Sequence, residues 1–168
     1  MKKLTVAILL VLSLTMSLFL GSCAEPEVKT TVHLTIVAGT ETVFDKDVTV
    51  KTAADNTNGP SVLDVLHYVM DNEDLDMALS SAGNTLEKAG IYYACDYEEV
   101  TYYWAFDIND KAPDAGKADT NYLKEGDTVT YNFMALVLVG ENTTEEEPYD
   151  NETRVFEDDL PGAGDAEE

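Results

Sequence analysis

The sequence predicts an α+β fold in which one main helix packs across a mixed β-sheet of about five strands. Three observations support this prediction. Apolar residues alternate with polar ones in residues 32–50, they follow helical spacing once, after residue 61, and they alternate again between residues 101 and 135. A helix with one apolar face must bury that face against the sheet that the surrounding strands form.

The first half of the predicted domain contains a hairpin and the helix. Residues 32–36 and 44–50 each place apolar side chains on one face, with a turn at 38–40 between them. Ser61 precedes Val62-Leu63-Asp64 as in a capping box, which predicts a helix start there. The apolar spacing then continues to a helix end near residues 71–72, and we expect residues 73–90 to be irregular.

The second half is predicted to supply the remaining strands. Residues 91–97 and 101–108 are the next two strands, and Asn109-Asp110 is a turn signal. A polar connection over 111–124 leads to a closing strand at 129–135. The order strand, strand, helix, strand, strand, strand is that of a β-grasp-like roll.

The N-terminal segment indicates export and lipid attachment. Lys2 and Lys3 precede an apolar run that ends in Leu20-Gly21-Ser22-Cys23, the layout of a secretion signal. The ending resembles the bacterial lipobox, whose cysteine receives a diacylglycerol. We therefore expect a signal peptide at 1–22, a lipid on Cys23, a tether over 23–31, and a location on the cell membrane facing the extracytoplasmic side. An ordinary signal peptide and an uncleaved anchor are the alternatives.

The charge restricts the class of partner. The chain has 33 acidic and 10 basic residues, and removing residues 1–22, which hold two lysines and no acid, leaves a net charge of −25. This charge opposes nucleic-acid binding, which needs a basic surface. With no basic patch to bind anionic lipid, the link to the membrane is expected to be the N-terminal lipid.

Composition also predicts the domain limits. Residues 32–137 have the size of a single domain, which we expect to be monomeric. Acids dominate the C-terminal end, so we expect residues 138–168 to form a disordered acidic tail that adds little stability.

If Cys23 carries lipid, Cys95 has no disulfide partner, and its apolar surroundings predict a buried small side chain.

Three stretches resemble the transcobalamin-like C-terminal domain family. The first two are residues 44–51 and residues 60–66. The third is the most specific and begins at residues 103–113, which read Tyr-Trp-Ala-Phe-Asp-Ile-Asn-Asp-Lys-Ala-Pro. It continues through Gly116 to residues 122–129, which read Tyr-Leu-Lys-Glu-Gly-Asp-Thr-Val. The family pattern is Trp-x-x-x-Val-Asn-Gly-x-x-Pro, then Gly, then Tyr-x-Leu-Lys-Asp-Gly-Asp. Members are β-grasp modules of bacterial surface lipoproteins and of vertebrate cobalamin carriers. The resemblance implies that fold, and cobalamin as a ligand.

The chain departs from the family at informative positions. Asp110 replaces the glycine of the Asn-Gly turn, and Tyr103 replaces the usual glycine before the tryptophan. The cobalamin carriers hold most of their ligand in a large helical domain that has no counterpart in the residues of this chain.

Aromatic side chains are the main indication of a binding face. They are concentrated in residues 92–104, and outward-facing aromatics on a sheet offer a large contact area, although cross-strand packing explains such a cluster equally well. Strand alternation places Trp104 in the core and Tyr103 on the opposite face. The candidate ligand-binding residues are Tyr92, Tyr103, Asn109, Lys111 and Pro113.

We therefore expect a lipid-anchored module that binds a small molecule, such as a corrinoid, for uptake. The alternative is a structural or adhesive surface domain that binds a protein or a glycan. An enzyme is the least favoured class, because neither histidine lies in a metal-ligand or catalytic motif, and we predict no catalytic residues, metal ligands or certain cofactor.

Replacing Cys23 with serine should release the protein from the membrane fraction, because no other cysteine lies near the cleavage point. Fractionation followed by an alkaline wash measures this. A Cys23→Ser protein that stays membrane-bound after the wash would identify residues 4–20 as a spanning anchor instead.

Overall fold

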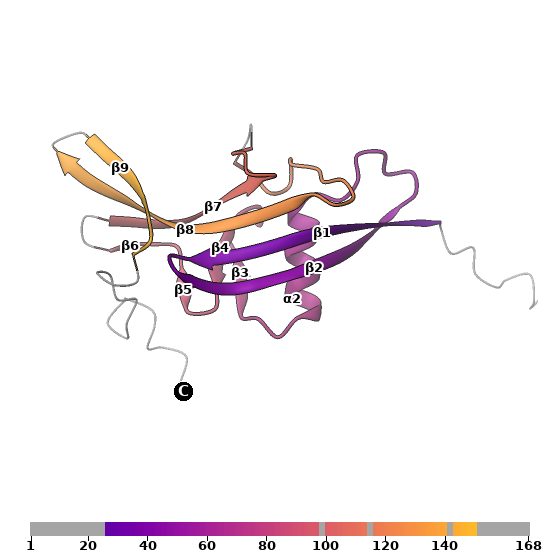
Figure 1. Ribbon diagram of the computed structural model, residues 1–168, viewed down its shortest axis with the longest axis horizontal. Helices are drawn as coiled ribbons and strands as arrows, with labels where there is room; N and C mark the ends of the chain where they lie inside the picture. The colour runs from indigo at the N-terminus through magenta and orange to yellow at the C-terminus, as the bar shows by residue number, and fades with distance from the viewer. Residues whose placement is uncertain (1–25, 98–99, 114–115, 141–142, 151–168) are drawn as a thin grey trace, which may run out of the picture.

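The computed structural model describes residues 26–97, 100–113, 116–140 and 143–150, which form one helix and two β-sheets (Figure 1). The elements are β1 (Glu27–Ala38), β2 (Glu41–Ala53), α2 (Val62–Asn72), β3 (Met77–Leu79), β4 (Leu86–Ala89), β5 (Tyr92–Tyr93), β6 (Cys95–Tyr97), β7 (Val100–Ile108), β8 (Thr128–Gly140) and β9 (Thr143–Pro148). The predicted signal peptide and Cys23 lie outside the described residues. None of the helices in the described part is long and apolar enough to span a bilayer.

The larger sheet is mixed, as predicted, and has six strands. Its order is β2-β1-β8-β7-β6, with β9 also paired to β8. The β1–β8 pair is parallel and every other pair in this sheet is antiparallel. β8, which corresponds to the predicted closing strand, therefore lies at the centre of the sheet, beside β1.

The hairpin and the helix form where the sequence predicts them, but β1 begins at Glu27, inside the predicted tether 23–31, because residues 27–31 pair with 49–53 of β2. Val32, Leu34 and Ile36 alternate along β1 and are at most 1% exposed. The capping box is present, since the Asp64 amide donates to Ser61 Oγ at 3.2 Å and the Ser61 amide donates to Asp64 Oδ2 at 2.7 Å. The buried face of α2 packs against the sheet, with β2 as its neighbour (Figure 1).

Residues 73–97 differ from the prediction. The stretch 73–90, expected to be irregular, contains β3 and β4, which join β5 in a second sheet of three short strands. The strand expected at 91–97 is divided at Ala94, whose amide donates to Glu87 O at 2.7 Å. Strands of two to four residues are too short to show a periodicity, and their partners are fixed only by tertiary packing.

The C-terminal boundary also differs. The predicted disordered tail begins at residue 138, but β8 continues to Gly140 and β9 pairs with it. The next residue after β9, Tyr149, is 3% exposed, and its amide donates to Phe133 O at 3.1 Å. The acids of β9 remain exposed while their backbone pairs, so a high charge did not prevent a strand here. Residues 151–168 lie outside the described part.

We predict that Tyr149→Ala lowers the free energy of unfolding by about 3 kcal/mol, as for other buried aromatic side chains. The matched control is Glu145→Ala on the exposed part of β9, which should change it by less than about 0.5 kcal/mol. Guanidinium denaturation measures both. Equal, small effects would mean that the C-terminal strand is not docked in solution.

Candidate functional site

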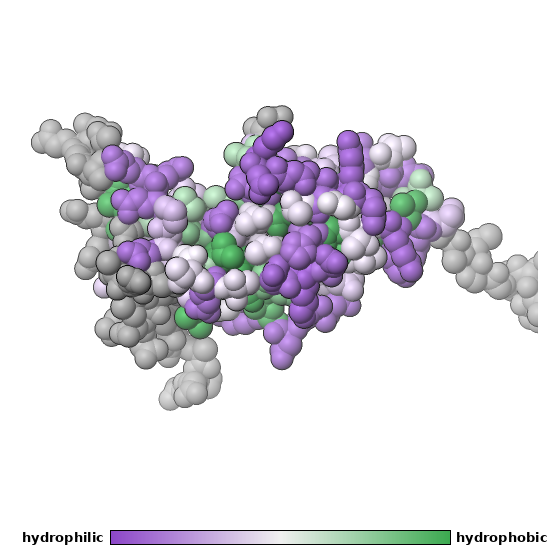
Figure 2. Space-filling view, viewed as in Figure 1, coloured by the Kyte–Doolittle hydropathy of each residue, from purple (hydrophilic) through white to green (hydrophobic). Residues whose placement is uncertain are grey.

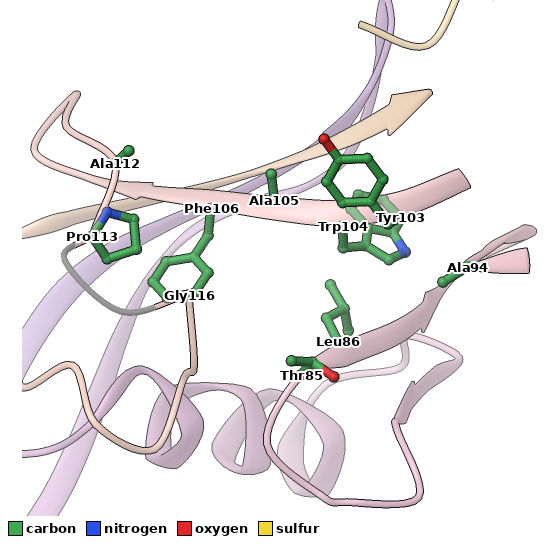
Figure 3. A pocket seen from close by; sticks show the side chains of 10 residues that line it. All are labelled: Thr85, Leu86, Ala94, Tyr103, Trp104, Ala105, Phe106, Ala112, Pro113 and Gly116. Carbon is green, nitrogen blue, oxygen red and sulfur yellow. The ribbon is translucent and has the colours of Figure 1, made fainter. Parts of the chain in front are cut away.

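A cavity of about 500 Å³ lies between β7, the start of β4 and the segment that follows the β7 turn (Figure 3). Its wall is mainly apolar and comes from segments that are far apart in the sequence. The lining residues are Thr85, Leu86, Ala94, Tyr103, Trp104, Ala105, Phe106, Ala112, Pro113 and Gly116.

The cavity lies beside the edge of β7. Four consecutive residues of this strand, 103–106, line it. Successive side chains of a strand point to opposite faces of the sheet, so a cavity that touches all four extends around the strand edge. Figure 3 shows this arrangement, with the Trp104 side chain toward Leu86 and the Tyr103 hydroxyl on the other side of the strand.

The edge is open because its neighbour is short. β6 pairs only with residues 100–102 of β7, and at Ala94 the chain turns away toward the small sheet. At the other end of β7, Lys111 forms an isolated antiparallel β-bridge with Ile108 across the turn. Among the described residues, no strand pairs with 103–107 on the side away from β8.

Trp104 forms part of both the core and the cavity wall. Its side chain is 8% exposed and its ring lies 4.8 Å from that of Phe133, centroid to centroid. Its indole Nε1 is buried and has no hydrogen-bond partner among the described residues. A buried donor without an acceptor costs free energy.

Among the described residues that line the cavity, Tyr103 carries a titratable side chain. Its side chain is half-buried, and its hydroxyl donates a hydrogen bond to the Glu146 carboxylate of β9. Burial, together with this acidic neighbour, raises the pKa of Tyr103 to about 12. The phenol therefore stays protonated at neutral pH and acts as a donor.

The structure brings together two of the five predicted ligand-binding residues. Tyr103 and Pro113 line the cavity, and Lys111 is exposed outside its lining. Tyr92 belongs to the core instead: it is 3% exposed and its hydroxyl donates to Glu41 Oε2 at 2.6 Å. The opposite wall, which includes Leu86, comes from residues whose strands had no periodic signal in the sequence.

The fifth predicted residue, Asn109, has a structural role. With Asp110 it forms a two-residue turn in which both φ angles are positive, 52° and 62°. Its Oδ1 accepts from the Thr128 amide at 3.0 Å and its Nδ2 donates to Asp127 Oδ1 at 2.9 Å. The side chain therefore fixes the start of β8 against the end of β7 and does not line the cavity.

His33, another group with a perturbed pKa, does not line the cavity. His33 lies on the exposed face of the hairpin, with Nδ1 2.8 Å from Asp47 Oδ1 and Nε2 2.8 Å from Asp45 Oδ1. Asp47 raises the pKa of His33 most, against a smaller opposing effect of burial, and Asp45 adds to the rise. No group of three or more potential metal-ligating side chains occurs in the described part of the chain.

Comparison with known proteins gives distant structural similarity only. No family model matches the chain, and no curated protein matches it in sequence. The structure is similar to haptocorrin in complex with Cbi, with a TM-score of 0.46 and 19% identity over 62% of this chain and 25% of that one. It is also similar to a candidate metal-binding protein from Ruminococcus gnavus, with a TM-score of 0.38 and 12% identity over 62% and 95%. The chain thus spans a quarter of the haptocorrin chain.

Replacing Asp110 with glycine should stabilise the fold by about 0.5–1 kcal/mol, because a positive φ is strained for any residue with a Cβ. Thermal or guanidinium denaturation measures the change. Asp119→Gly, at an exposed position outside this turn, is the control and should not stabilise. A destabilised Asp110→Gly protein would show that the aspartate side chain matters more than the backbone strain.

Proposed function

We propose that the chain is a membrane-anchored extracytoplasmic module that binds a small ligand in the cavity beside β7. The mainly apolar cavity beside the open edge of β7 is the observation that carries this proposal, since small-molecule sites are typically concave and lined by apolar side chains. The volume of about 500 Å³ lies in the range typical of small-molecule sites.

The lining defines the chemistry of the ligand. Among the described lining residues, no side chain carries a formal charge at neutral pH. The described lining holds two hydroxyls: that of Tyr103 donates to Glu146, and that of Thr85 donates to Ser80 Oγ at 2.7 Å. The rest of the wall is mainly hydrocarbon. The described wall therefore suits an apolar part of a ligand.

We propose a corrinoid as the first ligand to test, bound by a β-grasp domain of the transcobalamin-like type. The sequence stretch that resembles this family most closely, residues 103–113, supplies six of the ten residues of the cavity wall. A corrinoid would be covered on one side only, because the cavity is open beside β7. We therefore expect weaker binding than a ligand that is enclosed on both sides.

Binding is favoured over catalysis by the same lining. Acid–base or nucleophilic catalysis needs a group whose pKa lies near the working pH. Tyr103, whose pKa is raised to about 12, is the titratable side chain of the cavity wall that the structure describes. Its hydroxyl already donates to Glu146, so in this proposal Tyr103 contributes the contact area of its ring to the cavity wall.

Cobinamide and cobalamin should bind to the full chain in equilibrium dialysis and quench the fluorescence of Trp104, the single tryptophan of the sequence. Tyr103→Ala should weaken binding about tenfold, equivalent to roughly 1.4 kcal/mol. Tyr122→Ala removes an exposed tyrosine outside the cavity and is the control. Absence of binding by both corrinoids at millimolar concentration would exclude this ligand class.

A further inference from the structure

We infer that the open edge of β7 binds an extended peptide, which adds a strand to the larger sheet beyond the end of β6. The peptide would alternate small apolar with basic residues. This inference goes beyond the proposed small-molecule function and does not depend on whether a corrinoid binds.

The hydrogen-bond register of β7 leaves main-chain groups free at this edge. The Asn109 amide donates to Thr128 O at 2.9 Å, so the pair 109–128 is a hydrogen-bonded pair of the antiparallel β7–β8 ladder. Such pairs alternate with pairs that are not hydrogen-bonded to each other. The N–H and C=O groups of Trp104 and Phe106 therefore point away from β8, toward the edge that β6 leaves open.

The chemistry of this edge differs from that of the other long edge strand. β2 carries Asp45, Lys46 and Asp47 in succession, all exposed, and charges of this kind protect a sheet edge from pairing with other chains. Residues 103–106 of β7 carry no charge at neutral pH. Hydrophilic residues dominate the face of the molecule in Figure 2. Residues 103–106, in contrast, are Tyr, Trp, Ala and Phe.

The two faces of the sheet at this edge determine which side chains the peptide should carry. On one face, Trp104 and Leu86 form an apolar wall of the cavity. Residues of an antiparallel partner that hydrogen-bond to Trp104 and Phe106 place their side chains on this same face, so they should be small and apolar. Small side chains fit because the cavity is only about 500 Å³.

The opposite face is acidic. It holds Tyr103 and Asp107, and Tyr103 donates its hydroxyl to Glu146. The intervening residues of the peptide would point to this face, where a lysine or arginine side chain would lie near the carboxylate of Asp107 on β7 itself. The net charge of the whole chain, −23, also favours a basic partner.

The free protein provides the first test, through amide hydrogen exchange of the full chain measured by NMR. The amides of Trp104 and Phe106 should exchange about tenfold faster than those of Ala105 and Asp107, which bond to β8. Equal protection of all four amides would show that the edge is already paired, and would overturn the inference.

The second test uses the acetylated and amidated peptide Lys-Val-Lys-Val-Lys-Val-Lys at millimolar concentration. It should slow the exchange of the Trp104 and Phe106 amides at least about fivefold, the effect of one hydrogen bond. The same peptide with N-methylated valines should lose this effect, whereas N-methylation of the lysines should keep it, because only the valine amides face β7.

The acidic face is tested separately. Replacing the lysines of the peptide with glutamates should abolish protection, and Asp107→Asn should weaken binding of the lysine peptide several-fold. Glu145→Gln, at an exposed acid of β9 away from this edge, is the control and should have no effect. Failure of the lysine peptide to protect either amide, or equal loss with both N-methylated peptides, overturns the inference. Dialysis with corrinoids is unaffected by either outcome.

Discussion

The ring of Phe133, on the central strand β8, is the contact on which the rest of the structure depends. Four other aromatic rings lie against it, with centroid distances of 4.8 Å for Trp104, 5.3 Å for Tyr149, 5.6 Å for Tyr92 and 5.8 Å for Tyr102. These rings come from β7, the small sheet and the residue that follows β9. Because one side chain joins these separate parts of the chain, the small sheet and the C-terminal strand are held to the larger sheet by the same apolar cluster.

This packing explains where the cavity lies. Tyr92 is drawn into the core, so the chain leaves the line of β6 at Ala94, and β6 ends after covering only the first residues of β7. The space beyond it is bounded by Leu86 on one side and by Trp104 and Phe106 on the other. An open strand edge and an apolar cavity therefore have one cause, which is the change of direction between the two sheets.

The acidic surface of the molecule contrasts with the mainly apolar wall of its cavity. Acidic residues are abundant and lie mostly at exposed positions, as on β9, while the described residues of the cavity wall include no charged side chain. An acidic surface keeps the domain soluble and repels acidic partners. In the proposed function, the apolar wall would supply most of the contact with a ligand.

Local patterns determined the hairpin, the capped helix, and strands β7 and β8, because their periodicities and turn residues are contained within short stretches of sequence. The outward position of Tyr103 and the inward position of Trp104 follow from the same alternation. The sequence did not determine β3, β4 and β9, the burial of Tyr92, or the structural role of Asn109. These features depend on pairing and packing between residues far apart in the chain, such as Tyr149 on Phe133. The cavity likewise requires Leu86 and Trp104 to face each other, and only the tertiary structure places them so.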